Sequence, residues 1–161
     1  MPEQPDLQHV ADELAIRDLT ARFTDAVNRN DPAALGALFT EDGEWVVPGM
    51  ETTHGPEAAA ARIGELRTAF VQLLQLLYSG HVDLAADGQS AAATWYLAES
   101  ASDGENSFAF TGVYRDEMRR TDAGWRFARR TFSFLYRGRT ELPGKWYPHP
   151  AAPVSGPAAR R

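Results

Sequence analysis

The sequence contains no cysteine, which excludes disulfide bonds, thiolate metal centres and cysteine nucleophiles. An excess of positive charge is also absent, because 22 acidic residues outnumber 16 basic ones and give a net charge of −6. This balance argues against a generally basic surface and predicts no nucleic-acid partner. Long hydrophobic stretches are missing too. The most apolar one, residues 70–78, is interrupted by Gln72 and Gln75 and is far shorter than the ~20 residues of a membrane span.

The first residues are acidic and polar, unlike the basic start and apolar core of a signal peptide. We therefore expect a cytoplasmic protein that is not bound to a membrane. The histidines are scattered, and no pair has the helical spacing of metal ligands: they are His9, His54, His81 and His149. Together with the lack of cysteine, this scatter predicts a site that uses neither a metal nor an organic cofactor.

What the chain does contain is enough for one domain with a sizeable core, since 43% of its 161 residues are hydrophobic. Apolar residues at helical spacing predict a first helix from residue 7 to about 28. Asp31-Pro32 is typical of the start of a second, short helix. Gly55-Pro56 precedes a third helix, expected from residue 58 to about 66 or as far as 74.

After residue 76 the apolar residues follow the two-residue period of strands. We expect strands near residues 77–86, 90–101, 108–120 and 125–137, after a short strand at 44–47. Helices followed by antiparallel strands predict an α+β domain, in which a curved antiparallel sheet wraps around about three N-terminal helices. Such a sheet would enclose a conical apolar pocket, with these candidate lining residues: Phe23, Phe39, Trp45, Leu77, Trp95, Phe108, Phe110, Phe127 and Phe132.

The domain is expected to span residues 1–141. Residues 142–161 are rich in proline and alanine, and we expect this tail to pack against the domain at first and then to be disordered. The sequence shows no internal repeat.

Several short segments carry a family resemblance through their order and spacing: residues 16–19, 30–35, 38–45, 88–91, 95–99, 112–116 and 124–130. Together they resemble the SnoaL-like branch of the nuclear-transport-factor-two-like superfamily over about residues 8–137. The resemblance implies a cone-shaped α+β fold, found in isomerases, dehydratases, cyclases and binding modules. The resemblance to SnoaL-like polyketide cyclases implies a polyketide-like or other polycyclic apolar substrate. Proteins of this fold often form homodimers through the outer face of the sheet, so the resemblance also implies a homodimer here.

The resemblance also marks positions where relatives carry proton-transfer groups. In ketosteroid-isomerase relatives a general base precedes the turn after the first strand, and Val47 stands there in this chain. Dehydratase relatives carry an aspartate near the end of the first helix and a histidine in the second strand. These positions match Asn28 and either Gln75 or Leu77. Because none of these side chains transfers a proton readily, both mechanisms are disfavoured.

Glu99 is the strongest catalytic candidate. It matches an acidic residue that bile-acid-dehydratase-like relatives direct into the pocket, and by alternation it shares the core face with Trp95 and Leu97. Burial would raise the pKa of this carboxyl unless it is paired. Two interpretations stay open: an acid/base or substrate anchor, and a buried salt bridge to Arg129 or Arg130.

Other polar residues could support this chemistry. His81 could face Glu99 across neighbouring strands as a proton-transfer partner, and Asn28 could orient a water or a substrate oxygen. The predicted catalytic residues are therefore Glu99, His81 and Asn28. The predicted substrate-binding residues are Tyr78, Tyr114, Arg130, Trp45, Trp95, Phe23, Val47, Leu77 and Phe110.

The sequence thus predicts a cofactor-independent enzyme of the cyclase, dehydratase or isomerase kind that acts on an apolar small molecule. Two alternatives stay open. One is a non-catalytic small-molecule-binding module, and the other is a homodimeric structural domain with a filled core.

Overall fold

Three helices form one layer of the computed structural model, which describes residues 6–152: α1 (Leu7–Arg29), α2 (Pro32–Gly36) and α3 (Gly55–Ala69). The carboxylate of Asp6 caps the start of α1 by accepting a hydrogen bond from the Gln8 amide, and Asn30, whose φ is 56°, caps its C-terminal end. The carboxylate of Asp31 caps α2 in the same way, accepting from the Ala34 amide at 3.0 Å. The third helix ends at Ala69, between the two predicted limits.

Six strands form one sheet in the order β2-β1-β6-β5-β4-β3. They are β1 (Phe39–Val46), β2 (Thr53–His54), β3 (Gln72–Leu84), β4 (Ser90–Ser102), β5 (Ser107–Thr121) and β6 (Gly124–Thr140). The α+β class and the curved sheet are confirmed. The sheet is not wholly antiparallel, however, because β1 runs parallel to β6. No hairpin joins these two strands, so no tight turn imposes opposite directions on them.

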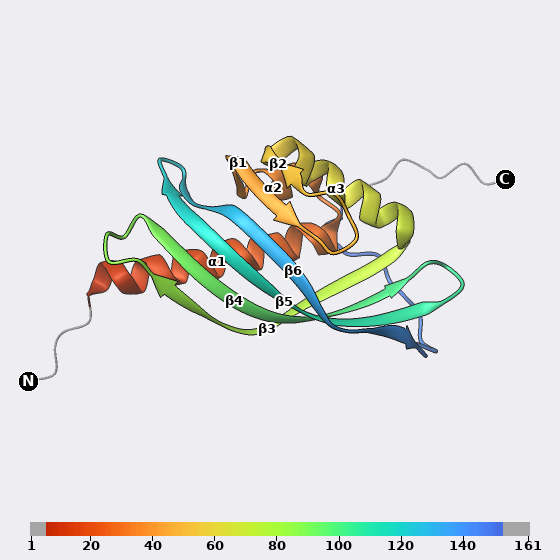
Figure 1. The fold of residues 1–161 in the computed structure, drawn as a ribbon. Helices are drawn as coiled ribbons and strands as arrows, with labels where there is room; N and C mark the ends of the chain where they lie inside the picture. Colours follow the sequence, from red (N-terminus) through yellow and green to blue (C-terminus); the bar gives the residue numbers. More distant parts are fainter. Residues whose placement is uncertain (1–5, 153–161) are drawn as a thin grey trace, which may run out of the picture.

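The sheet bends around the helical layer, with α1 lying along its concave side and α3 beside the other end (Figure 1). Two glycines mark the bends, and each lies at an irregularity of strand register. A Cβ at Gly80 would lie 2.3 Å from the Trp95 ring, and one at Gly112 would lie 2.2 Å from the Phe132 ring. Both positions therefore require glycine so that an aromatic ring can cross the bent strand.

One end of the core is closed by a polar cluster around Asp12, which is 5% exposed. Its carboxylate accepts hydrogen bonds from Trp125 Nε1 and Gln8 Nε2, both at 3.2 Å, and pairs with Arg120. Burial alone would raise the pKa of Asp12, but these donors outweigh it and hold the pKa below its usual value. The cluster fastens the start of α1 to the β5–β6 hairpin.

The middle of the core holds a buried charge. Arg130 is fully buried, and its Cζ lies 4.1, 3.9 and 4.3 Å from the ring centroids of Phe23, Tyr114 and Phe127. Its Nε lies 3.3 Å from Oδ1 of Asp116, which is also buried. Ring faces thus surround the guanidinium, a favourable cation–π arrangement.

Within residues 6–152, no helix combines the length and apolarity needed to cross a membrane. Residues 141–152 form neither helix nor strand. Residues 153–161 of the predicted tail lie outside the described residues.

Candidate functional site

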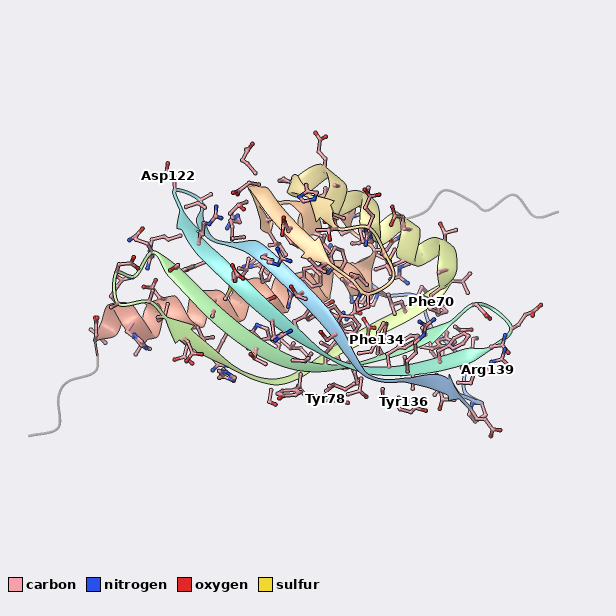
Figure 2. All side chains as sticks on the ribbon, viewed as in Figure 1. Phe70, Tyr78, Asp122, Phe134, Tyr136 and Arg139 are labelled. Atoms are coloured by element: carbon pink, nitrogen blue, oxygen red, sulfur yellow. The ribbon has the colours of Figure 1, made fainter. Side chains whose placement is uncertain are left out.

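A cavity of about 340 Å³ opens between the concave side of the sheet, the end of α3 and the loop after β1. Its wall is mostly aromatic and aliphatic: Trp45, Val47, Pro48, Gly49, Met50, Glu65, Leu66, Ala69, Phe70, Leu73, Glu99, Phe110, Tyr114, Phe132, Phe134 and Arg137. Phe70 and Phe134 lie on the helix side of the sheet, whereas Tyr78 and Tyr136 lie on its outer side (Figure 2). The predicted apolar pocket therefore exists, at the end of the sheet covered by α3.

Glu99 supplies a partly buried carboxylate to this wall from β4. Its Oε1 accepts a hydrogen bond from Gln75 Nε2 at 2.8 Å. Burial raises the pKa of Glu99, and the hydrogen bond from Gln75 opposes this rise only in part. A carboxylate with a raised pKa in an apolar wall is the arrangement expected of a general base or acid.

Gln75, on β3 and 1% exposed, holds two cavity residues in place. The Thr24 hydroxyl donates to its Oε1 at 3.1 Å, which directs its Nε2 group toward Glu99 and toward the Tyr114 hydroxyl, 3.2 Å away. Burial raises the pKa of Tyr114, so this phenol stays protonated. Its oxygen accepts from Gln75, and no acceptor among residues 6–152 is bonded to its O–H, so this O–H can donate into the cavity.

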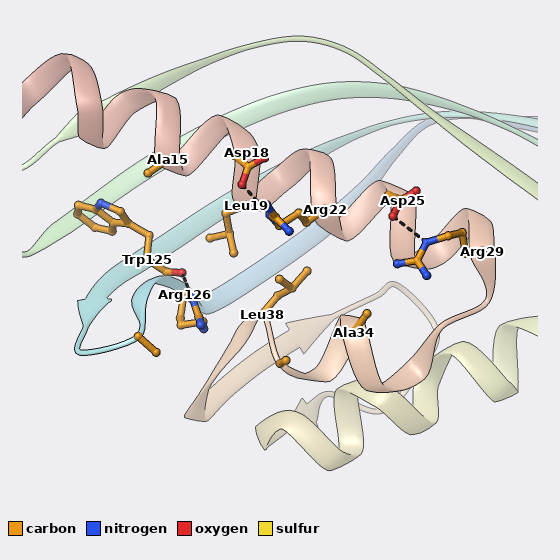
Figure 3. Close-up of a pocket in the computed structure, with 12 residues that line it drawn as sticks. Ala15, Asp18, Leu19, Arg22, Asp25, Arg29, Ala34, Leu38, Trp125 and Arg126 are labelled. Atoms are coloured by element: carbon orange, nitrogen blue, oxygen red, sulfur yellow. Dashed lines mark hydrogen bonds and ion pairs between the residues drawn. The ribbon is translucent and has the colours of Figure 1, made fainter. Parts of the chain in front are cut away.

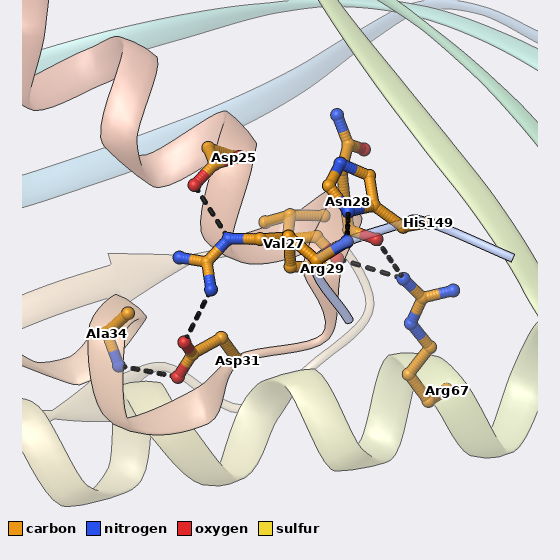
Figure 4. A network of polar contacts seen from close by, with 9 residues as sticks. Asp25, Val27, Asn28, Arg29, Asp31, Ala34, Arg67 and His149 are labelled. Atoms are coloured by element: carbon orange, nitrogen blue, oxygen red, sulfur yellow. Dashed lines mark hydrogen bonds and ion pairs between the residues drawn. The ribbon is translucent and has the colours of Figure 1, made fainter. Parts of the chain in front are cut away.

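Asn28 does not reach the cavity wall. Its Oδ1 accepts from the Gln75 amide at 2.7 Å, and its Nδ2 donates to the Gln75 carbonyl at 2.9 Å. Its main chain is fixed as well, because Arg67 of α3 donates to the carbonyls of Val27 and Asn28 at 2.9 and 3.3 Å (Figure 4). Asn28 therefore positions β3, and the prediction that it contacts substrate is corrected.

The predicted pairing of His81 with Glu99 is also wrong. Glu99 lies opposite Gln75, whereas His81 lies opposite Thr94. An extra residue between Leu77 and Gly80 reverses the alternation of β3, so the His81 side chain lies on the outer face, 65% exposed. Its Nε2 lies 3.8 Å from Asp83.

The remaining predicted binding residues divide into two groups. Those in the cavity wall are Trp45, Val47, Phe110 and Tyr114. Those outside it are Tyr78, which is 67% exposed on the outer face, and the core residues Phe23, Leu77, Trp95 and Arg130.

The two neighbouring arginines are separated by the alternation of β6. Arg130 points inward and pairs with Asp116, while Arg129 points outward and pairs with Glu44. Neither forms an ion pair with Glu99, so the structure does not support the predicted salt bridge of that carboxyl.

The sequence did not identify several residues that line the cavity or support its wall. The signal for Gln75 was present, because it stands between Leu73 and Leu77 on the buried face of a strand, where an unpaired amide would be costly. Leu66, Phe70 and Arg137 depend on how the end of α3 and the far part of β6 meet the sheet. Local sequence patterns carry no information on this tertiary packing.

A second, larger hollow of about 530 Å³ lies between α1, α2 and the β5–β6 turn (Figure 3). The charges that α1 contributes are paired with one another: Arg22 with Asp18 at 2.6 Å and Arg29 with Asp25 at 2.7 Å. Such pairs at i,i+4 spacing are typical of a solvated helix face. These charges are therefore less suited to act on a bound molecule than the carboxylate of Glu99 in its apolar cavity.

No group of three histidine, aspartate or glutamate side chains that could hold a metal ion occurs in residues 6–152. Within this range, the polar groups of the cavity wall that can take part in chemistry are Glu99, Tyr114 and two further charged side chains, Glu65 and Arg137.

The chain belongs to the SnoaL-like domain family, whose sequence profile matches residues 8–131. The fold and the order of the matching segments agree with this assignment. The resemblance inferred from the sequence is confirmed.

Among curated relatives, gamma-hexachlorocyclohexane dehydrochlorinase from Sphingobium indicum is 28% identical over 129 residues, which cover 78% of this chain and 81% of that protein. Hexachlorocyclohexane dehydrochlorinase 1 from the same species is 24% identical over 127 residues, covering 77% and 82%. Among solved structures, the dehydrochlorinase LinA-type3 from Novosphingobium barchaimii superposes with a TM-score of 0.79 at 22% identity, covering 90% of this chain and 99% of that chain. An NTF2-like protein with a cystatin-like fold from Novosphingobium aromaticivorans has a TM-score of 0.66 at 29% identity, covering 80% and 85%.

Proposed function

We propose that this protein is a cofactor-independent lyase in which Glu99 takes a proton from a carbon atom of a compact apolar molecule. The observation that carries the proposal is the partly buried carboxylate of Glu99, with its raised pKa, in the wall of an aromatic cavity. Its Oε1 is held by Gln75, and within the described residues no donor is bonded to Oε2. The curated relatives named dehydrochlorinases support an elimination as the reaction type.

The proposed elimination uses two cavity groups that Gln75 holds in place. Glu99 accepts the C–H proton, the electron pair of that bond forms the new double bond, and the leaving group departs with the electrons of its own bond. The protonated Tyr114 phenol donates a hydrogen bond to the atom on which negative charge develops. The dehydratase relatives imply an aspartate and a histidine at positions where this chain has Asn28 and either Gln75 or Leu77. The proton transfer therefore falls to Glu99.

The size of the cavity restricts the substrate. Its volume of about 340 Å³ is near the lower end of the ~300–1,000 Å³ typical of ligand pockets. Rings of Phe70, Phe110, Phe132 and Phe134 form much of its wall. We therefore favour one or two fused rings, such as a small polyketide-like molecule, over an extended polycyclic substrate.

The elimination of 5-nitrobenzisoxazole tests this function without knowledge of the natural substrate. A base removes its ring C–H proton, the N–O bond breaks, and a nitrile and a coloured phenolate form. We expect saturable product formation by the wild-type protein, above that of acetate at equal concentration. Absence of this reaction would contradict the lyase and favour the non-catalytic binding module.

Filling the cavity should weaken the reaction. Ala69→Trp places an indole in the cavity wall and is expected to lower kcat/KM at least ~10-fold, mainly through KM, because the probe loses its space. Thr68→Trp is the matched control, since Thr68 is exposed and lies outside the wall. Equal kcat/KM values for the two variants would place the reaction outside this cavity.

We also propose that a second copy of the chain covers the outer face of the sheet. Large apolar side chains are exposed across it: Leu74, Leu76, Tyr78, Tyr96, Leu135 and Tyr136. Leu76, Ala98, Thr111 and Tyr136 lie opposite one another, so a band of exposed and half-buried side chains crosses all four long strands, with Thr111 as the polar member of this row.

Light scattering at increasing concentration tests this assembly. We expect a wild-type dimer and at least ~30-fold weaker association in Tyr96→Glu, because a carboxylate would be buried within the band. Tyr147→Glu, in the exposed segment after β6, is the control and should remain dimeric. A wild-type monomer would contradict the assembly.

A further inference from the structure

One cross-strand row joins the two ends of the cavity wall. Gln75 lies opposite Glu99, Glu99 lies opposite Phe110, and Phe110 lies opposite Arg137. Directly opposed residues point to the same face of a sheet, which here is the concave side. Because neighbouring strands are ~4.8 Å apart, the backbones of Glu99 and Arg137 lie roughly 10 Å apart, with the Phe110 ring between them.

Arg137 provides the positive charge of the cavity wall at its exposed end. Its Cζ lies 5.6 Å from the Phe134 ring centroid. Within residues 6–152, no carboxylate lies within 4.0 Å of its guanidinium. Glu65, the nearby acidic wall residue, is instead paired with Arg62 at 2.8 Å. Among the described residues, a bound anion would therefore not have to displace a carboxylate partner of Arg137.

The two charges of the row favour one orientation of an anionic ligand. The Glu99 carboxylate repels an anion placed beside it, whereas the planar guanidinium of Arg137 can donate two parallel hydrogen bonds to a carboxylate. The Phe110 ring, 5% exposed, offers an apolar surface between the two positions. A ring system lying on Phe110 would present its carboxylate to Arg137 and its far C–H to Glu99.

We propose that Arg137 is a specificity-determining residue and that the substrate is a compact cyclic carboxylate bound with its anionic group at the cavity mouth. This inference rests on the proposed function for the identity of the reacting end. It adds the substrate class and the orientation in which the substrate binds.

Paired probes of nearly equal shape test the inference: 2-naphthoate, which is anionic, and 2-naphthamide, which is neutral. By isothermal titration, we expect the wild-type protein to bind 2-naphthoate ~10-fold more tightly, as expected for one charge-assisted contact. Arg137→Gln should abolish this preference and change 2-naphthamide binding less than ~2-fold. Because Arg137 is exposed, this substitution leaves the core intact.

Two further variants separate a direct contact from general electrostatics and from the reaction. Arg139→Gln removes a neighbouring exposed charge that is outside this wall, and the preference should persist. Glu99→Gln removes the proposed base, and the preference should also persist.

The outcomes distinguish the inference from the proposed function. Equal affinity for both probes, or a preference that survives Arg137→Gln, overturns the role of Arg137 and leaves the lyase standing. Failure of both probes to bind overturns the inference together with the small-molecule cavity. A preference that is lost only in Arg137→Gln supports the inference, even if Glu99→Gln retains elimination activity and thereby refutes the proposed base.

Discussion

Glu99→Gln is expected to lower kcat/KM for 5-nitrobenzisoxazole elimination by ~10²–10⁴-fold, the usual contribution of a positioned general base. The amide keeps the size of the side chain and can still contact Gln75, but it cannot accept a proton from carbon. The loss should therefore occur in kcat, with binding of 2-naphthamide retained. Product absorbance under saturating and subsaturating conditions measures both constants.

The pH dependence provides an independent check on this base. Only ionised Glu99 accepts a proton, so the rate should rise with pH through a midpoint above the ordinary value of 4.5, because burial raises the pKa. The stability of the folded protein has the opposite pH dependence. The folded protein holds this proton more tightly than the unfolded chain, so ionisation of Glu99 lowers the stability as the pH rises above 4.5.

Glu99→Gln should remove this pH-dependent loss of stability. Relative to wild type, its free energy of unfolding, measured with urea, should increase as the pH rises above 4.5. Glu117→Gln is the matched control, because Glu117 is an exposed carboxylate on β5 and lies outside the cavity wall. Unchanged elimination by Glu99→Gln, or equal loss in both variants, would contradict the assignment of the base.

The inward direction of Glu99 could be predicted because it depends on local alternation. Within β4, Trp95 and Leu97 are buried and Tyr96 is exposed, as the two-residue period requires. The same rule fails for His81, because a bulge in β3 reverses the face. That bulge accommodates the Trp95 ring against Gly80, a contact with another strand. Local patterns do not contain such a contact.

The residues that lie near Glu99 depend on the register between strands, which could not be predicted from the sequence. In the sequence, Gln75 stood out as an interruption of an apolar stretch and as one of two candidates for the position of the dehydratase histidine. Its role follows instead from its position opposite Glu99. Arg137 becomes part of the site because Phe110 aligns it with Glu99 across three strands. The composition predicted an apolar cavity, whereas the hydrogen-bond pattern between strands decides which polar groups share it.

Arg130→Met is expected to lower the free energy of unfolding by about 3–5 kcal/mol at neutral pH, the typical effect of breaking a buried ion pair. The substitution leaves the buried Asp116 carboxylate without its cation, which lies 3.3 Å away in the wild type. It also removes the charge that Phe23, Tyr114 and Phe127 surround. Urea unfolding followed by tryptophan fluorescence measures the change.

The size of this loss should depend on pH. Burial raises the pKa of Asp116 to about 6, although Arg130 opposes the rise. Without Arg130 the pKa should rise further, so the ionised carboxylate becomes more costly to bury. The difference between wild type and Arg130→Met should therefore increase as the pH rises above about 6, and should be smallest below it, where Asp116 is protonated in both folded proteins.

A second substitution separates charge from packing. In the Arg130→Met background, Asp116→Leu removes the uncompensated carboxylate and should recover most of the lost stability, because apolar side chains can replace a buried ion pair. Arg129→Met, which breaks the outward pair with Glu44, should change stability by less than about 1 kcal/mol. If Asp116→Leu restores nothing and the loss is independent of pH, packing of the Arg130 side chain among the three rings, rather than its charge, stabilises the core beside the cavity.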